Sequence, residues 1–202
     1  MAINLANNNS LANITALPAS ITGGAMTLLA TQTASGSANL SFTSGIDDTY
    51  DNYVFKFYNI HPATDNVQFL FNMSSDSGSN YNVTKTTTYF LAEHNATGGS
   101  ANLSYQSAKD LAQSTDFQKL MTDLGNAADE NLSGYLTIYN PSSTTFAKHF
   151  MSRTNAQAYS ATNISFDNYI AGYGNTTSAV DAIQFKMSSG NFDGVIKLYG
   201  VS

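Results

Sequence analysis

Alternation of apolar and polar residues is the dominant pattern from Met26 to the C-terminus. The clearest example is the stretch 52–60, NYVFKFYNI, in which every second side chain is a large ring: Tyr53, Phe55 and Phe57. Successive side chains of a strand point to opposite faces, so this period of two predicts a strand with one buried face. The His61-Pro62 pair predicts its end, because proline cannot donate a hydrogen bond to a neighbouring strand.

The same period predicts nine more strands, separated by turn sequences rich in Gly, Ser, Asn and Asp. They fall at residues 26–34, 39–43, 67–72, 83–91, 135–139, 148–156, 169–173, 183–187 and 195–199. About ten short strands without helices between them predict an all-β protein, an antiparallel two-sheet β-sandwich of jelly-roll-like type. The stretch 107–124 is the exception. Its apolar residues do not repeat cleanly at helical spacing, so it predicts at most one short helix or an irregular crossover.

Residues 1–25 differ from the rest of the chain. They are rich in Asn, Ala and other small residues, contain no aromatic residue and are punctuated by Pro18, Gly23 and Gly24. We expect a short N-terminal arm here, serving either as an anchor on a partner or as a flexible leader. Residues 26–202 are expected to form the single β-sandwich domain. The first residues show neither a basic nor an apolar signal region, so no secretory signal is expected.

Charge and composition narrow the classes of partner. Charged residues make up only 11% of the chain, and 14 acids against 8 bases give a net charge of −6. No basic cluster is present to displace counterions from phosphate, so we expect no nucleic-acid partner. No apolar stretch reaches the length of a membrane span, so membrane insertion is not expected either. A surface wetted mainly by hydroxyls and amides suits an extracellular or virion location.

The sequence offers no constellation typical of catalysis. There are no cysteines, which excludes disulfides, thiolate zinc sites and cysteine nucleophiles. The histidines, His61, His94 and His149, lack metal-site spacing, and no serine lies in a G-x-S-x-G or S-x-x-K motif. We therefore predict no catalytic, cofactor-binding or metal-binding residue, no cofactor and no enzymatic activity.

The acids gather in segments that we interpret as solvated loops. The two clusters are Asp47-Asp48-Asp51 and Asp123-Asp129-Glu130. Calcium binding is the alternative, since carboxylates in loops suit this cation, and the segment 74–80 has a similar composition. That segment lacks the terminal glutamate of an EF-hand loop, so calcium stays the minor interpretation.

Tyrosine is the remaining candidate for surface contact. Four tyrosines fall where the pattern allows exposure: Tyr50, Tyr105, Tyr159 and Tyr173. They could cap the edge of the core, which we favour, or contact sugars and partner proteins through ring and hydroxyl. Strand edges must also be covered, and few charges are available to repel neighbours. We therefore expect a homo-oligomer, with a trimer favoured by analogy with many fibrous virion parts.

Several segments resemble structural proteins of tailed bacteriophages, particularly those of marine bacteria. These are residues 41–90, residues 140–153 (NPSSTTFAKHFMSR) and residues 176–202, which close on the strand IKLYG after a Ser-Ser-Gly-Asn turn. The leader SLANITALPAS at residues 10–20 is similar to short N-terminal pieces of such proteins. Together the resemblance covers about residues 10–202.

The resemblance implies a place on the virion rather than a mechanism. It favours a non-enzymatic fibre or tail-associated surface component that docks through residues 1–25 and faces the host surface, with host glycans as a ligand. The alternative is a capsid decoration or cement protein that bridges major capsid subunits. A lectin-like carbohydrate-binding module is the lesser alternative. No functional residue is carried over from the resemblance.

Overall fold

The computed structural model describes residues 26–99, 101–159 and 163–202, so the proposed N-terminal arm at residues 1–25 lies outside the described residues. Within them the chain forms twelve strands and no helix. The strands are β1 (Thr27–Ser37), β2 (Asn39–Phe42), β3 (Asn52–Pro62), β4 (Val67–Ser74), β5 (Lys85–Asn95), β6 (Ala101–Tyr105), β7 (Gln118–Leu124), β8 (Leu132–Tyr139), β9 (Lys148–Ala158), β10 (Ile164–Gly174), β11 (Ala182–Met187) and β12 (Phe192–Val201).

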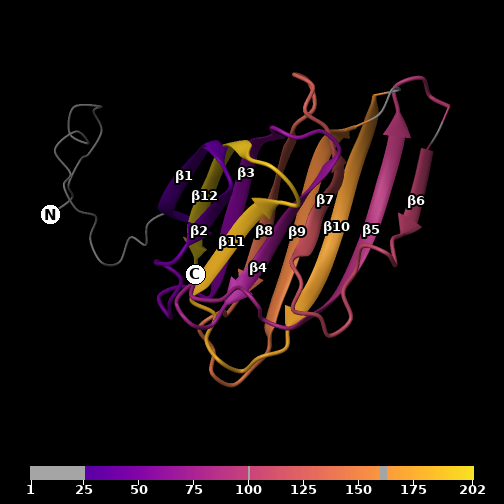
Figure 1. Ribbon diagram of the computed structural model, residues 1–202. Coiled ribbons are helices and arrows are strands. Elements are labelled where there is room, and N and C mark those ends of the chain that lie inside the picture. Colours follow the sequence, from indigo (N-terminus) through magenta and orange to yellow (C-terminus); the bar gives the residue numbers. More distant parts are fainter. Residues whose placement is uncertain (1–25, 100, 160–162) are drawn as a thin grey trace, which may run out of the picture.

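All twelve strands belong to one antiparallel sheet. Hydrogen bonds run along the path β1-β12-β3-β8-β9-β7-β4-β11-β2, and β10, β5 and β6 extend the sheet sideways from β9. Figure 1 shows β8, β9, β10, β5 and β6 as one broad layer, with β2, β11 and β4 in front of the other end. These two parts of the sheet are connected through a single backbone pair between strands, Leu124 of β7 with Ala158 of β9.

The two ends of this path nearly meet. Gln32 on β1 donates its side-chain amide to the carbonyl oxygen of Ser41 on β2, at 2.9 Å. The sheet is therefore an antiparallel sheet nearly closed into a barrel, which confirms the all-β prediction. Because hydrogen bonding continues from one part to the other, the finer description as a two-sheet, jelly-roll-like sandwich stays a prediction.

A cluster of phenylalanines fills the space inside the curled sheet. Phe185 on β11 lies at its centre, fully buried, with five other rings around it at centroid distances between 5.2 and 6.4 Å. These rings come from three other strands: Phe42 on β2, Phe55 and Phe57 on β3, and Phe69 and Phe71 on β4. The contacts join the narrow part of the sheet to the broad part, as the alternation in 52–60 and 67–72 predicts.

The segment 107–124 is the main correction to the sequence prediction. The helix considered there is wrong, because residues 118–124 form strand β7. The preceding residues run along the edge of β5: the Thr87 N–H donates to the Leu111 carbonyl at 2.9 Å, and Lys85 and Ser114 exchange backbone hydrogen bonds. This stretch thus covers a strand edge that would otherwise expose unpaired groups.

Several polar side chains are buried as well. Among the described residues, every buried side-chain nitrogen and oxygen has a hydrogen-bond partner. Two lysines, Lys85 and Lys148, are fully buried, and both lie opposite Gly174 of β10 in the sheet register. A Cβ on this glycine would lie 2.8 Å from Met73 Cε and 3.0 Å from Val83 Cγ1. These two side chains occupy the space that a larger residue at position 174 would need.

Candidate functional site: an aromatic trough on the sheet surface

The solvent-facing surface of β5, β10, β9 and β8 carries an unusual number of exposed rings. Residues on these strands that lie in one row across the sheet are paired by register: Tyr169 with Phe90 on one side and with Arg153 on the other. Arg153 is in turn opposite Tyr135 of β8, and Phe90 is opposite Tyr105 of β6. Side chains on one face of neighbouring strands contact each other, so the row forms a continuous strip.

We call this surface the outer trough and define it by the exposed side chains of that row and their neighbour Met151. Their exposed fractions are 46% for Tyr105, 43% for Phe90, 39% for Tyr169, 43% for Tyr135 and 55% for Met151. Large apolar side chains gathered on a surface are typical of an interaction site, whereas isolated ones need no explanation.

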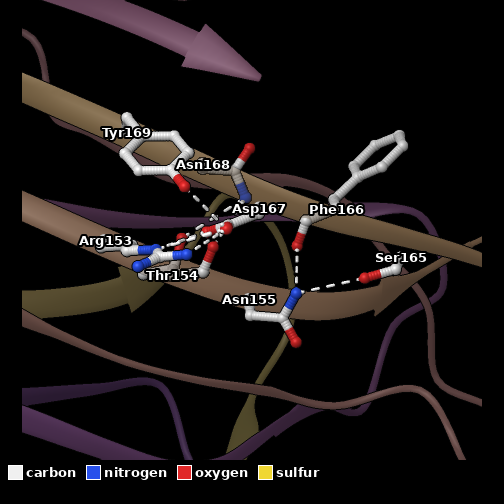
Figure 2. A network of polar contacts seen from close by, with 8 residues as sticks. All are labelled: Arg153, Thr154, Asn155, Ser165, Phe166, Asp167, Asn168 and Tyr169. Atoms are coloured by element: carbon white, nitrogen blue, oxygen red, sulfur yellow. Dashed lines mark hydrogen bonds and ion pairs between the residues drawn. The ribbon is translucent and has the colours of Figure 1, made fainter. Parts of the chain in front are cut away.

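Arg153 and Asp167 form the polar centre of the outer trough (Figure 2). The guanidinium donates to both carboxylate oxygens, most closely from Nε to Oδ1 at 3.0 Å and from Nη2 to Oδ2 at 2.6 Å. The hydroxyl of Tyr169 donates to the same carboxylate at 3.0 Å, and the guanidinium lies over the Tyr169 ring, 4.9 Å from its centroid. Such bidentate, stacked arginines hold a fixed orientation.

The electrostatics follow from this geometry. The hydrogen bond from Arg153 holds the pKa of Asp167 below its usual range. The hydrogen bond that Tyr169 donates to Asp167 raises the pKa of Tyr169, because loss of the phenol proton would break this bond. At neutral pH the site therefore presents a charged pair and an intact phenol hydroxyl side by side.

Two shallow depressions lie along the outer trough. One, of about 330 Å³, is lined by Phe90, Tyr135, Arg153 and Tyr169 among others. The second, of about 280 Å³, lies beside Tyr139, His149 and Tyr173. They share Thr88, Met151 and Ala171, so they form one elongated hollow across four strands. Ala171 lies between Tyr169 and Tyr173 on the same face of β10, so its small side chain leaves space between their rings.

This arrangement can bind a ligand through its rings and its ion pair. Exposed rings can stack on the apolar faces of sugars, and the Arg153–Asp167 pair supplies donors and acceptors for hydroxyl groups at fixed positions. A shallow, elongated hollow accommodates an extended chain better than a small compact ligand. The candidate ligand class is therefore an oligosaccharide or polysaccharide.

The histidines are placed apart from one another. His61 on β3 has Nε2 3.1 Å from the carbonyl oxygen of Ala127, and His149 on β9 packs beside Tyr173 with ring centroids 6.1 Å apart. His94 lies on β5. Within the described ranges, no group of three or more His, Cys, Asp or Glu residues is positioned to hold a metal ion.

The interpretation of the acids as solvated loops is wrong for two of them. Asp123 lies on β7 and forms an ion pair with Lys109 at 3.6 Å. Glu130 is buried and accepts the Ala127 N–H at 3.0 Å.

Other acids fix turns of the chain. Asp76 accepts hydrogen bonds from Ser74 Oγ at 2.7 Å and from the Asn80 backbone N–H at 2.8 Å, which ties the turn 74–80 together. Asp47 accepts from the Thr49 N–H at 2.9 Å and from the Tyr53 hydroxyl at 3.0 Å. These contacts give the acids a role in fixing turns.

The tyrosine prediction is partly right. Tyr50 is half-buried and packs against the core, as the favoured interpretation of core-edge capping expects. Tyr105 and Tyr159 are exposed, Tyr105 belongs to the outer trough, and the half-buried Tyr173 lines the second hollow. The sequence reasoning missed Tyr135 and Tyr169 as site residues. The available signal was the alternation within each strand: Tyr135 and Tyr169 lie on the face opposite the buried residues Leu136 and Ile170, and therefore face solvent.

Comparison with known proteins leaves this chain without a match, whether against protein-family models, curated proteins or solved structures. The fold and the site thus define it as an all-β protein with an exposed aromatic surface. Across the described part of the chain, no helix has the length and apolar character needed to cross a membrane.

Proposed function

We propose that this chain is a non-enzymatic structural protein of a bacteriophage virion, a fibre or tail-associated surface component whose outer trough contacts a glycan of the host surface. The virion location rests on the resemblance of residues 41–90, 140–153 and 176–202 to phage structural proteins. The glycan contact rests on one observation, the row of exposed rings that flanks the Arg153–Asp167 pair.

The nature of the surface favours a sugar ligand over a nucleic acid. The chain has a net charge of −6, and the guanidinium of Arg153 is already held by Asp167, which leaves little positive charge for phosphates. Aromatic rings beside an ion pair with no net charge match the alternating apolar and hydroxyl-bearing faces of a pyranose.

Glycan-array binding of the full chain tests this function. Binding to an oligosaccharide class should weaken by about tenfold or more when either Tyr135 or Tyr169 is changed to alanine, since ring contacts at the centre of a site carry most of its binding energy. Tyr159→Ala is the matched control, because Tyr159 is 48% exposed but takes no part in lining the hollow. Equal binding by all three variants would refute the assignment of the trough.

The capsid decoration protein is the second candidate for the place on the particle. Measuring the copy number per purified virion separates the two, because a decoration protein follows the capsid lattice and is far more abundant than a fibre. Deleting residues 1–25 should abolish incorporation into particles if these residues dock the protein, and undiminished incorporation would contradict the anchor.

The proposal includes self-association, with a trimer favoured. β6 is a candidate contact, since among the described strands it pairs with β5 alone and it carries Leu103, which is 70% exposed. An open edge with an exposed leucine favours pairing with another chain. Light scattering coupled to gel filtration should give an oligomer that Leu103→Lys weakens, whereas a stable wild-type monomer would contradict it.

A further inference from the structure

A buried lysine and a buried asparagine lie in direct contact between β5 and β4. Lys85 Nζ is 2.5 Å from Asn72 Oδ1, and both side chains are fully buried. The carboxamide carbon is one C=O bond of about 1.2 Å from that oxygen, so Nζ lies within about 3.7 Å of it. This separation approaches the distance at which an amine can attack a carbonyl. No carboxylate forms an ion pair with Lys85 among the described residues.

The Lys85 amine is in a suitable state for attack. Burial lowers its pKa to about 7, although the charge of Asp116 acts in the opposite direction. A large share of the amine is therefore neutral at neutral pH, and a neutral, desolvated lysine amine is a nucleophile. A second hydrogen bond, from Nζ to the carbonyl oxygen of Val83 at 2.8 Å, keeps the amine beside Asn72.

Hydrogen bonds fix the Asn72 carboxamide in one orientation beside the amine. Its Nδ2 donates to the carbonyl oxygens of Tyr81 at 2.6 Å and Thr115 at 2.9 Å, which fixes the amide orientation. Its Oδ1 accepts the backbone N–H of Met73 at 2.8 Å. A fixed N–H donor at this position would stabilise the negative charge that develops on the oxygen during attack.

We propose that Lys85 and Asn72 join in an intramolecular isopeptide bond, formed by the protein without a cofactor. The neutral amine adds to Asn72 Cγ, and the negative charge on Oδ1 is held by the Met73 N–H. A proton then passes from Nζ to Nδ2, the Cγ–Nδ2 bond breaks, and ammonia leaves. The product is a secondary amide, and the step needs neither an oxidant nor a reductant.

The second buried lysine serves as an internal comparison. Lys148 also has no exposed surface, but in the described part of the chain the hydrogen bonds of its Nζ go to backbone carbonyl oxygens, those of Phe146 at 2.5 Å and Thr176 at 3.3 Å. Attack on a backbone carbonyl carbon would have to expel the amino group of the next residue, which would break the chain. Lys148 thus shares the burial of Lys85 without sharing its reaction partner.

Intact-mass spectrometry of the purified full chain tests the proposal. The wild-type protein should weigh about 17 Da less than its sequence, the mass of one ammonia molecule. Asn72→Ala and Lys85→Met should each restore the full mass calculated for the variant, whereas Lys148→Met should keep the deficit. A wild-type mass equal to that of the sequence would overturn the proposal, whether or not the variants fold.

Peptide mapping locates the bond. Between Lys56 and Lys109 the only tryptic site is Lys85, and trypsin does not cut after an acylated lysine. The linked protein should therefore yield a peptide spanning 57–109 with the ammonia deficit, where an unlinked one yields 57–85 and 86–109. Tyr81 lies inside the loop of residues 72–85 that the proposed bond would close. Chymotryptic cleavage after Tyr81 should therefore leave two fragments that are still joined by the Lys85–Asn72 bond. A deficit mapped elsewhere in the chain would likewise refute this bond, and neither result depends on glycan binding.

Discussion

Replacing Phe185 by alanine is the most direct test of how the curled sheet is held together. This ring is fully buried on β11 and has rings from β2, β3 and β4 around it. Truncating a buried phenylalanine costs about 3–5 kcal/mol through lost burial and the cavity left behind. Aromatic pairs add about 0.5–1.5 kcal/mol each beyond burial, so we expect a loss near the upper end, about 4–5 kcal/mol.

Equilibrium unfolding in urea, followed by tyrosine fluorescence and far-ultraviolet circular dichroism, measures this loss. A domain is typically stable by only about 5–15 kcal/mol, so the variant should unfold at a much lower urea concentration. Phe146→Ala is the matched control, because this ring is 68% exposed and its removal should change the free energy of unfolding by less than about 0.5 kcal/mol.

A loss below about 2 kcal/mol for Phe185→Ala, at an unchanged denaturant slope, would refute the reasoning. It would mean that β11 does not pack against β3 as described. Should the alanine variant fail to fold, Phe185→Leu provides the measurement with a smaller expected loss, below about 3 kcal/mol, since most of the buried volume is retained.

Two further predictions concern the outer trough and its support. A Cβ on Gly134 of β8 would lie 2.3 Å from the Arg153 carbonyl oxygen, so Gly134→Ala should push β8 and β9 apart and cost about 1–3 kcal/mol in urea unfolding, whereas Gly99→Ala, with 3.6 Å to its nearest neighbour, should cost much less. The pKa of Asp167 is depressed in the folded protein, so its pair with Arg153 stabilises the fold above the ordinary aspartate pKa and this contribution disappears as the pH falls through the folded value. Thermal unfolding at a series of pH values should therefore show a smaller loss on acidification for Asp167→Asn than for the wild type, and parallel curves would contradict this sign.

Strands with strict alternation were predictable from the sequence because each has one buried face. β3, β8 and β9 follow their predicted phases, with Phe55, Leu136 and Phe150 inside. β6 was missed because four of its five residues are exposed, so no buried face marks it, and it forms only by pairing with β5. β7 was missed because it is buried on both faces for most of its length, which erases the period of two.

The contacts inside and outside the sheet were less predictable than the strands. Lys85 and Asn72 occupy positions that a polar–apolar pattern does not mark as a site, and the two side chains meet where the chain turns back between the end of β4 and the start of β5. The outer trough depends on register: Tyr135, Arg153 and Tyr169 are on three strands whose order is not encoded by periodicity. Chain-distant pairing of this kind is visible only once the sheet is assembled.

The pairing of β1 with β12 has a practical consequence. Thr27 lies opposite Gly200, so the described chain begins and ends at the same corner of the sheet, at the margin opposite β6 (Figure 1). A tag or display scaffold fused after Ser202 would therefore leave from this corner. Immobilising the protein through that corner on a sensor chip should therefore keep both the rings around Arg153 and the β6 margin accessible to an analyte in solution.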